Sequence, residues 1–222
     1  MIPKIIWQTY ESSYKELPKS AKHSAELWQK YNPSWEYQYV SAQDRLNFVE
    51  KHFDKEWFTL FTSLPQNMYK GVLFKYMAVY IYGGVATDLD AICRAPIESW
   101  LVPGYEMVVT YDEDETEYAT WAFASVPKSQ AIEDLLKTIK VNLTKYSTEE
   151  LNSDVTYYGI NIFGETPLTI SVKKYAEKTY VHESLDASQN LLNGKGAKHL
   201  ARTKNWEKEG YLEWYSPKNL NG

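Results

Sequence analysis

The chain has 222 residues and a net charge of −5, with 44% hydrophobic and 24% charged residues. These values are typical of a soluble globular domain with a sizeable core, and the lack of a basic stripe argues against a nucleic-acid partner. No apolar run approaches the roughly 20 residues of a membrane-spanning helix, and the N-terminal residues do not resemble a signal peptide. The single cysteine, Cys93, suits a reducing compartment. We therefore expect a cytoplasmic protein without a transmembrane segment.

Strands and helices are predicted to alternate along the chain without internal repeats or a linker. The expected strands are residues 2–10, 35–40, 85–87, 106–110, 119–125 and 179–182. The expected helices are residues 20–31, 41–53 with Ser41 as N-cap, 55–64, 66–82, 128–146 and 167–176. Polar loops are expected at 11–18 and 112–117, and a polar tail from residue 193. This order predicts one α/β domain with a mainly parallel sheet.

The clearest predicted helix, residues 66–82, leads into an acidic motif. Gly83-Gly84 is a typical helix terminator. The side chains that recur at helical spacing and form the apolar face of this helix are Val72, Leu73, Tyr76, Met77, Tyr80 and Ile81. A short apolar strand is expected next, followed by Asp88 and Asp90. In an extended segment both carboxylates would point to one side, with Leu89 toward the core. Carboxylate oxygens suit Mn²⁺ or Mg²⁺. A D-x-D sequence is more often a solvated loop, but the preceding helix, glycine pair and strand favour a metal site at the end of a buried strand.

Three segments resemble one known family. GGVATDLD, at residues 83–90, resembles the G-G-x-x-x-D-x-D core of the glycosyltransferases with a DXD sugar-binding region. That family includes yeast-type initiating α-mannosyltransferases and capsule enzymes, and the clostridial glucosylating toxins are distant relatives. IPKIIWQTY, at residues 2–10, and NPSWEYQYVSAQD, at residues 32–44, resemble two earlier motifs of the family. The resemblance implies a single domain of GT-A type over residues 1–222, with a Rossmann-like, mixed, mainly parallel sheet flanked by helices. The domain would stand alone or form one module of a longer protein.

The resemblance also implies roles in the first half of the chain. Asp90 would ligate the metal directly, and Asp88 would contact the donor ribose or sugar and the metal shell. Trp7 would stack on the nucleobase or pack in the core. Lys75 stands where relatives have an arginine that contacts the donor; its alternative is a place on the helix surface. Val72 stands where relatives have a sugar-binding aspartate, which leaves the identity of the sugar open.

Further roles are implied in the C-terminal half. His199 would be the third metal ligand, Trp206 would donate its indole N–H to the donor β-phosphate, and Lys204 would neutralise the diphosphate; ordinary surface or core positions are the alternatives. Glu165 is the candidate general base or acceptor-orienting carboxylate. Asp112 competes for that role, although its acidic neighbourhood is typical of a solvated loop.

We therefore expect an enzyme that moves a hexose from a nucleoside diphosphate sugar to a hydroxyl group of a glycan or glycoconjugate. A UDP-sugar is favoured over a GDP-sugar, and Mn²⁺ or Mg²⁺ would act as a Lewis acid on the diphosphate. Retention and inversion of configuration both stay open. One alternative is a non-catalytic nucleotide-sugar or glycan-binding module, and another is a metal-dependent phosphohydrolase.

Overall fold

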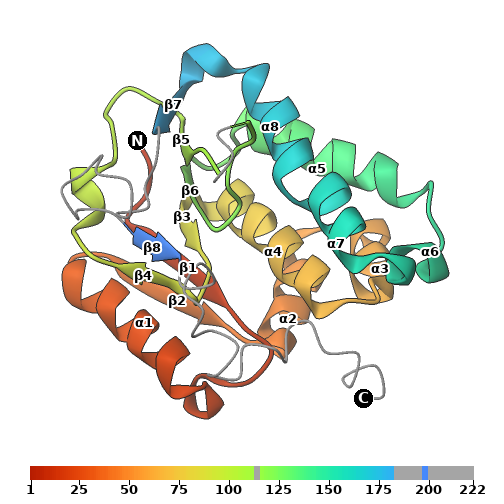
Figure 1. Ribbon diagram of the computed structural model, residues 1–222, viewed down its shortest axis with the longest axis horizontal. Coiled ribbons are helices and arrows are strands. Elements are labelled where there is room, and N and C mark those ends of the chain that lie inside the picture. The colour runs from red at the N-terminus through yellow and green to blue at the C-terminus, as the bar shows by residue number, and fades with distance from the viewer. Residues whose placement is uncertain (113–115, 183–196, 200–222) are drawn as a thin grey trace.

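The computed structural model describes residues 1–112 and 116–182, together with the backbone of residues 197–199. A central sheet has helix α1 on one face and the other α-helices on the opposite face (Figure 1). The strands are β1 Ile5–Thr9, β2 Glu36–Val40, β3 Gly84–Thr87, β4 Ala91–Cys93, β5 Met107–Thr110, β6 Ala122–Ser125, β7 Thr179–His182 and β8 Ala197–His199. The α-helices are α1 Lys19–Tyr31, α2 Ala42–His52, α3 Lys55–Ser63, α4 Asn67–Tyr82, α5 Gln130–Leu143, α6 Thr148–Ser153, α7 Val155–Tyr158 and α8 Glu165–Lys173.

The main sheet has six strands in the order β2-β1-β3-β6-β5-β7. The pairs β1–β2, β1–β3 and β5–β7 are parallel, whereas β6 runs antiparallel to both β3 and β5. Five strands therefore end at the same edge of the sheet, and β6 begins there. The predicted mixed, mainly parallel sheet flanked by helices is confirmed.

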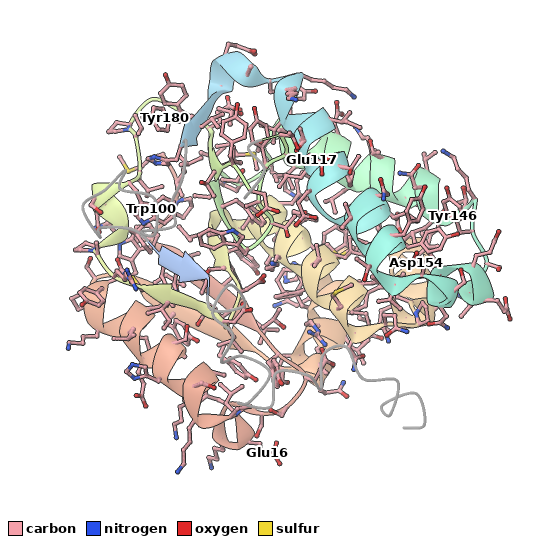
Figure 2. All side chains as sticks on the ribbon, in the orientation of Figure 1. Glu16, Trp100, Glu117, Tyr146, Asp154 and Tyr180 are labelled. Atoms are coloured by element: carbon pink, nitrogen blue, oxygen red, sulfur yellow. The ribbon has the colours of Figure 1, made fainter. Side chains whose placement is uncertain are left out.

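Alternating side chains along the strands build a core on each face of this sheet. Along β1, Ile6 belongs to the cluster on the α1 side and Trp7 to the cluster beneath α4, and Val85 and Ala86 of β3 divide in the same way. This period of two is the pleat of the strand. Figure 2 shows Trp100 and Tyr180, which pack on the α1 side, far from Tyr146 at the end of the opposite helical layer. Within the described residues, no helix is both long and apolar enough to cross a membrane.

The junction between α4 and β3 depends on the two predicted glycines. Gly83 ends the helix at φ +70°, and Gly84 follows at φ +106°. A Cβ atom on Gly84 would lie 2.5 Å from the carbonyl oxygen of Ile5. Only glycine combines this left-handed backbone with so close an approach. The helix can therefore turn directly into the strand that leads to the D-x-D motif.

Several elements differ from the sequence prediction. All six predicted strands and six predicted helices are present, and all but the strand at 179–182 have shifted ends. Ser41 accepts a hydrogen bond from the Asp44 N–H as the predicted N-cap. Strand β4, helices α6 and α7, and a π-helical turn at Gly159–Phe163 (η3) were not expected, and strand β8 lies where a polar tail was expected. These elements have three to six residues, which is too few for periodicity to be read, and β4 depends on pairing with the distant β8.

Candidate functional site

The D-x-D motif lies at the sheet edge where the parallel strands end. The Asp88 backbone is fixed by three neighbours: its N–H donates to the Trp121 carbonyl (2.8 Å), and its carbonyl accepts from the Gln8 side chain (3.0 Å) and from the Ala91 N–H (3.1 Å). Tyr37 in turn donates to the Gln8 side-chain oxygen at 2.7 Å. Ligands bind at this edge in open α/β sheets, so the backbone presents Asp88 where a ligand is expected.

The motif is a turn rather than an extended segment. Leu89 and Asp90 occupy a turn that the Ala91-to-Asp88 hydrogen bond closes, and β4 starts immediately afterwards. The expectation that the strand pleat aligns the two carboxylates is therefore wrong, because β3 ends at Thr87. Leu89 is 3% exposed and packs in the core as expected. Asp88 and Asp90 are both half-buried, so their hard carboxylate oxygens fit an ion such as Mn²⁺ or Mg²⁺ that completes its shell with water and phosphate.

Lys75 forms an ion pair with Asp88 and donates to the Thr120 carbonyl at 2.8 Å. The Lys75 side chain is 2% exposed, whereas that of Asp88 is 26% exposed. The alternative of a lysine on the helix surface is therefore wrong. Lys75 lies on α4, so this helix places a buried positive charge next to Asp88 at the sheet edge.

Glu165 is the first residue of α8, and it contacts Thr120, the residue whose carbonyl accepts from Lys75. Its Oε1 accepts a hydrogen bond of 3.1 Å from the Thr120 hydroxyl, and the side chain is half-buried. Burial raises the pKa of Glu165, and the negative charge of Asp112 adds to the rise, while Thr120 and Lys75 oppose it. Asp112 follows β5 at the same edge, and its N–H donates to the Glu117 carbonyl at 2.9 Å. The structure thus brings both carboxylates that compete for the base role to one region.

Tyr76 is a polar group of the site that the sequence prediction placed on the apolar face of the helix. It is fully buried, and its hydroxyl has no hydrogen-bond partner within residues 1–112 and 116–182. Burial and the charges of Glu165 and Asp88 raise the pKa of Tyr76 well above its usual value. The only sequence feature that could have linked Tyr76 to the site is its position directly after Lys75. The hydroxyl stays protonated close to two carboxylates.

Trp7 packs in the core beneath α4. It is 6% exposed, and its indole N–H donates to the Gly83 carbonyl at 2.9 Å. Phe48 and Phe74 meet it edge-on, with ring centroids 6.2 Å and 6.5 Å away. This is the packing alternative for Trp7; stacking on a nucleobase stays a prediction.

A buried arginine fixes the loop after β1. Arg45 of α2 is 1% exposed, pairs with Glu11 and donates to the Thr9 hydroxyl at 3.2 Å. Burial and the charge of Arg45 lower the pKa of the nearby Lys70. The sequence prediction assigned no role to these side chains.

The C-terminal candidates are placed only in part. Strand β8 pairs antiparallel with β4 so that His199 lies opposite Ala91, the residue after Asp90. The backbone of His199 is therefore beside the motif, as a third metal ligand would require; Trp206 and Lys204 lie outside the described residues. Among the side chains that the structure describes, no group of three or more His, Cys, Asp or Glu could hold a metal ion.

Residues 18–108 match the protein family described as "Glycosyltransferase sugar-binding region containing DXD motif". Inositol phosphoceramide mannosyltransferase 2 of Schizosaccharomyces pombe is 28% identical over 147 residues, which cover 66% of this chain and 41% of the relative. The initiation-specific alpha-1,6-mannosyltransferase of Saccharomyces cerevisiae is 27% identical over 104 residues, 45% of this chain and 22% of that protein. The chain thus spans less than half the length of these relatives.

Solved structures show the same fold. The UDP-bound glycosyltransferase domain from the YGT toxin superposes with a TM-score of 0.57 at 8% identity, covering 89% of this chain and 82% of that one. PaToxG glycosyltransferase superposes with a TM-score of 0.52 at 15% identity, covering 79% and 70%. The GT-A type of fold is therefore confirmed, and so is the predicted resemblance to DXD glycosyltransferases.

Proposed function

We propose that this chain is a metal-dependent glycosyltransferase domain that transfers a hexose from a nucleoside diphosphate sugar to a hydroxyl group of a glycan or glycoconjugate. The supporting observation is the buried Lys75 paired with Asp88 at the carboxyl edge of the sheet, inside the segment that matches the DXD family. A UDP-sugar is the favoured donor, and a toxin domain of the same fold was solved with UDP bound. Because two relatives are named mannosyltransferases, mannose donors are the next to test.

Asp88 and Asp90 would hold Mn²⁺ or Mg²⁺, with His199 as the third ligand. When bound, the ion supplies Lewis acidity that makes the diphosphate a better leaving group. Lys75 adds positive charge beneath the same oxygens, and its burial at 2% exposure strengthens that interaction because little water screens it. The fixed backbone of Asp88 orients the donor before reaction, which lowers the entropic part of the barrier.

The transfer forms a bond between the acceptor oxygen and the anomeric carbon and breaks the bond from that carbon to the β-phosphate oxygen. The acceptor proton then needs a base. If configuration is inverted, Asp112 or Glu165 takes the proton. If configuration is retained, the leaving phosphate takes it. Trp206 and Lys204 would close on the diphosphate and exclude water.

The test is turnover of a panel of UDP-glucose, UDP-galactose and GDP-mannose with Mn²⁺, with and without glycan acceptors. Wild-type turnover that Asp90→Ala abolishes would support the proposal. Donor binding without turnover for every acceptor would favour the non-catalytic binding module instead. Release of inorganic phosphate from simple phosphate esters would favour a phosphohydrolase.

A further inference from the structure

The Tyr76 hydroxyl is an unusual group in this core. Its oxygen is buried and has no hydrogen-bond partner in the described part of the chain. Buried polar atoms are nearly always paired, and an unpaired one reduces the stability of the folded protein. A phenylalanine would fill the same space without that cost. The retained hydroxyl therefore calls for a use outside the packing of the core.

The surroundings of the hydroxyl lie in the proposed site. Tyr76 follows Lys75 on α4, and its ring packs against Phe123 of β6 with centroids 5.3 Å apart. Glu165 and Asp88 are the charged groups that act on the hydroxyl. Asp88 already pairs with Lys75. Glu165 accepts one hydrogen bond from Thr120, and a carboxylate has room for several more.

The charge around the hydroxyl selects the kind of ligand. Asp88 is already paired with the Lys75 ammonium group, whereas Glu165 accepts from the neutral Thr120 hydroxyl. A phosphate beside the Glu165 charge would be repelled, because like charges in a poorly hydrated site interact strongly. A neutral hydroxyl group can instead donate to a carboxylate oxygen. In a nucleoside diphosphate sugar, the hexose supplies such hydroxyls, a few ångströms from the diphosphate that Asp88 and Lys75 would face.

We propose that Tyr76 and Glu165 form a sugar-binding pair in the donor complex. The Tyr76 hydroxyl donates to the Glu165 carboxylate, and this carboxylate accepts a hydrogen bond from a hydroxyl group of the hexose. Glu165 is then the group that contacts the sugar, and Tyr76 is a positioning residue that acts through it. The assignment rests on the proposed function and leaves Asp112 as the base for an inverting reaction.

Helix α4 contains a matched control. Tyr69 lies seven residues before Tyr76, hence on the same face of the helix, and is also fully buried. Its hydroxyl donates to the carbonyl of Leu151 at 2.8 Å. Tyr69→Phe therefore removes a paired hydroxyl, whereas Tyr76→Phe removes one without a partner.

The experiment measures urea unfolding and calorimetric donor binding for wild type and both variants. The probes are the UDP- or GDP-hexose that binds in the panel above and the matching nucleoside diphosphate without sugar. Tyr76→Phe should leave the unfolding midpoint unchanged or higher. It should also weaken binding of the nucleotide sugar by about 10-fold, with no change for the nucleoside diphosphate. Tyr69→Phe should lower the midpoint and leave both affinities unchanged.

Two results would overturn this inference alone. One is a lower midpoint for Tyr76→Phe, like that of Tyr69→Phe, since it would show a hydroxyl already paired without donor. The other is equal affinity of Tyr76→Phe and wild type for the nucleotide sugar. If wild type binds no member of the panel, the proposed function itself fails, and the sugar-binding pair fails with it.

Discussion

Lys75 forms an ion pair with Asp88, and the lysine is the buried partner, with 2% of its side chain exposed against 26% for the aspartate. A protein cation thus contacts the first acid of the D-x-D motif. A divalent ion bound by Asp88 has to share that carboxylate with the Lys75 ammonium group, or displace the ammonium toward the diphosphate. The affinity for metal alone and the affinity for metal with donor should therefore respond differently to changes at Lys75.

Replacing Lys75 by methionine should raise the affinity for Mn²⁺ alone and reduce glycosyl transfer. The methionine keeps the buried volume but removes a positive charge close to the metal-binding oxygens, which strengthens their attraction for a cation. The donor diphosphate loses the same charge, so turnover falls. Mn²⁺ titration by calorimetry and a transfer assay measure both effects. Weaker Mn²⁺ binding by Lys75→Met would show that the Lys75 ammonium group does not compete with the ion for Asp88.

Removing the more exposed partner of the ion pair, Asp88, should destabilise the protein more than removing the buried partner, Lys75. Asp88→Ala leaves a buried ammonium group with the Thr120 carbonyl and should cost about 2–4 kcal/mol in free energy of unfolding. Lys75→Met leaves a carboxylate that water can reach, so it should cost less. The double variant should be more stable than Asp88→Ala. Urea unfolding of the three variants measures this, and equal costs for the two single variants would argue against the asymmetry.

Asp90→Ala should lower metal-dependent transfer by about 100-fold or more, because it removes one of the two carboxylates proposed to hold the ion. The unfolding free energy of the variant is measured alongside, so that transfer rates are compared between folded proteins. Glu50→Ala removes an exposed carboxylate of α2 and is the matched control, with transfer expected at the wild-type rate. Retained Mn²⁺-dependent transfer by Asp90→Ala would rule out this ligand.

Glu165→Gln should stabilise the protein increasingly as the pH rises. The pKa of Glu165 is raised from its ordinary value of 4.5, so between the two values the folded state keeps a proton that the unfolded state has lost. Stability contributed by this group is therefore present at low pH and is lost as the pH rises through that window. Glutamine does not titrate, and its Oε1 can still accept from Thr120. The difference in unfolding free energy between variant and wild type, measured from pH 4 to pH 7, should grow; a constant difference would contradict a raised pKa.

Gly84→Ala should destabilise the domain by about 3 kcal/mol or more. It combines a positive φ with a Cβ atom 2.5 Å from the Ile5 carbonyl oxygen. Gly104→Ala provides the comparison, since Gly104 has φ +95° but nothing within 4 Å of its Cβ position. That variant should cost only about 1–2 kcal/mol, the backbone strain alone. Thermal unfolding separates the two, and similar losses would show that the contact with Ile5 relaxes freely.

Much of the fold was predictable from the sequence because short apolar runs mark the buried strands and apolar residues at helical spacing mark the helices. Trp7 and Ile6 point to opposite faces, as the pleat requires, and the glycine pair ends α4 where the sequence indicates. Strand β4 was not predictable because three residues show no period, and its partner β8 lies about a hundred residues later. Hydrophobic patterns report local burial, not pairing between distant segments.

The candidate site was predictable at Asp88, Asp90 and Lys75 because the family motif fixes their order and spacing. The turn at the motif was not, since a three-residue window looks alike in a strand and in a turn. Tyr76 was assigned to the apolar face because periodicity reports that a side chain is buried and not whether its hydroxyl finds a partner. Only the structure shows that the hydroxyl has no partner among the described residues and that the charges of Glu165 and Asp88 act on it.

The pairing of β4 with β8 makes the border of the acidic turn depend on a distant part of the chain. Strand β4 begins directly after Asp90, and its partner strand β8 comes from residues 197–199. A version of the protein shortened before residue 197 would lack that partner strand. Any trimmed form made for crystallisation or for fusion to another domain therefore has to keep residues 197–199 if the backbone beside the acidic turn is to stay as it is.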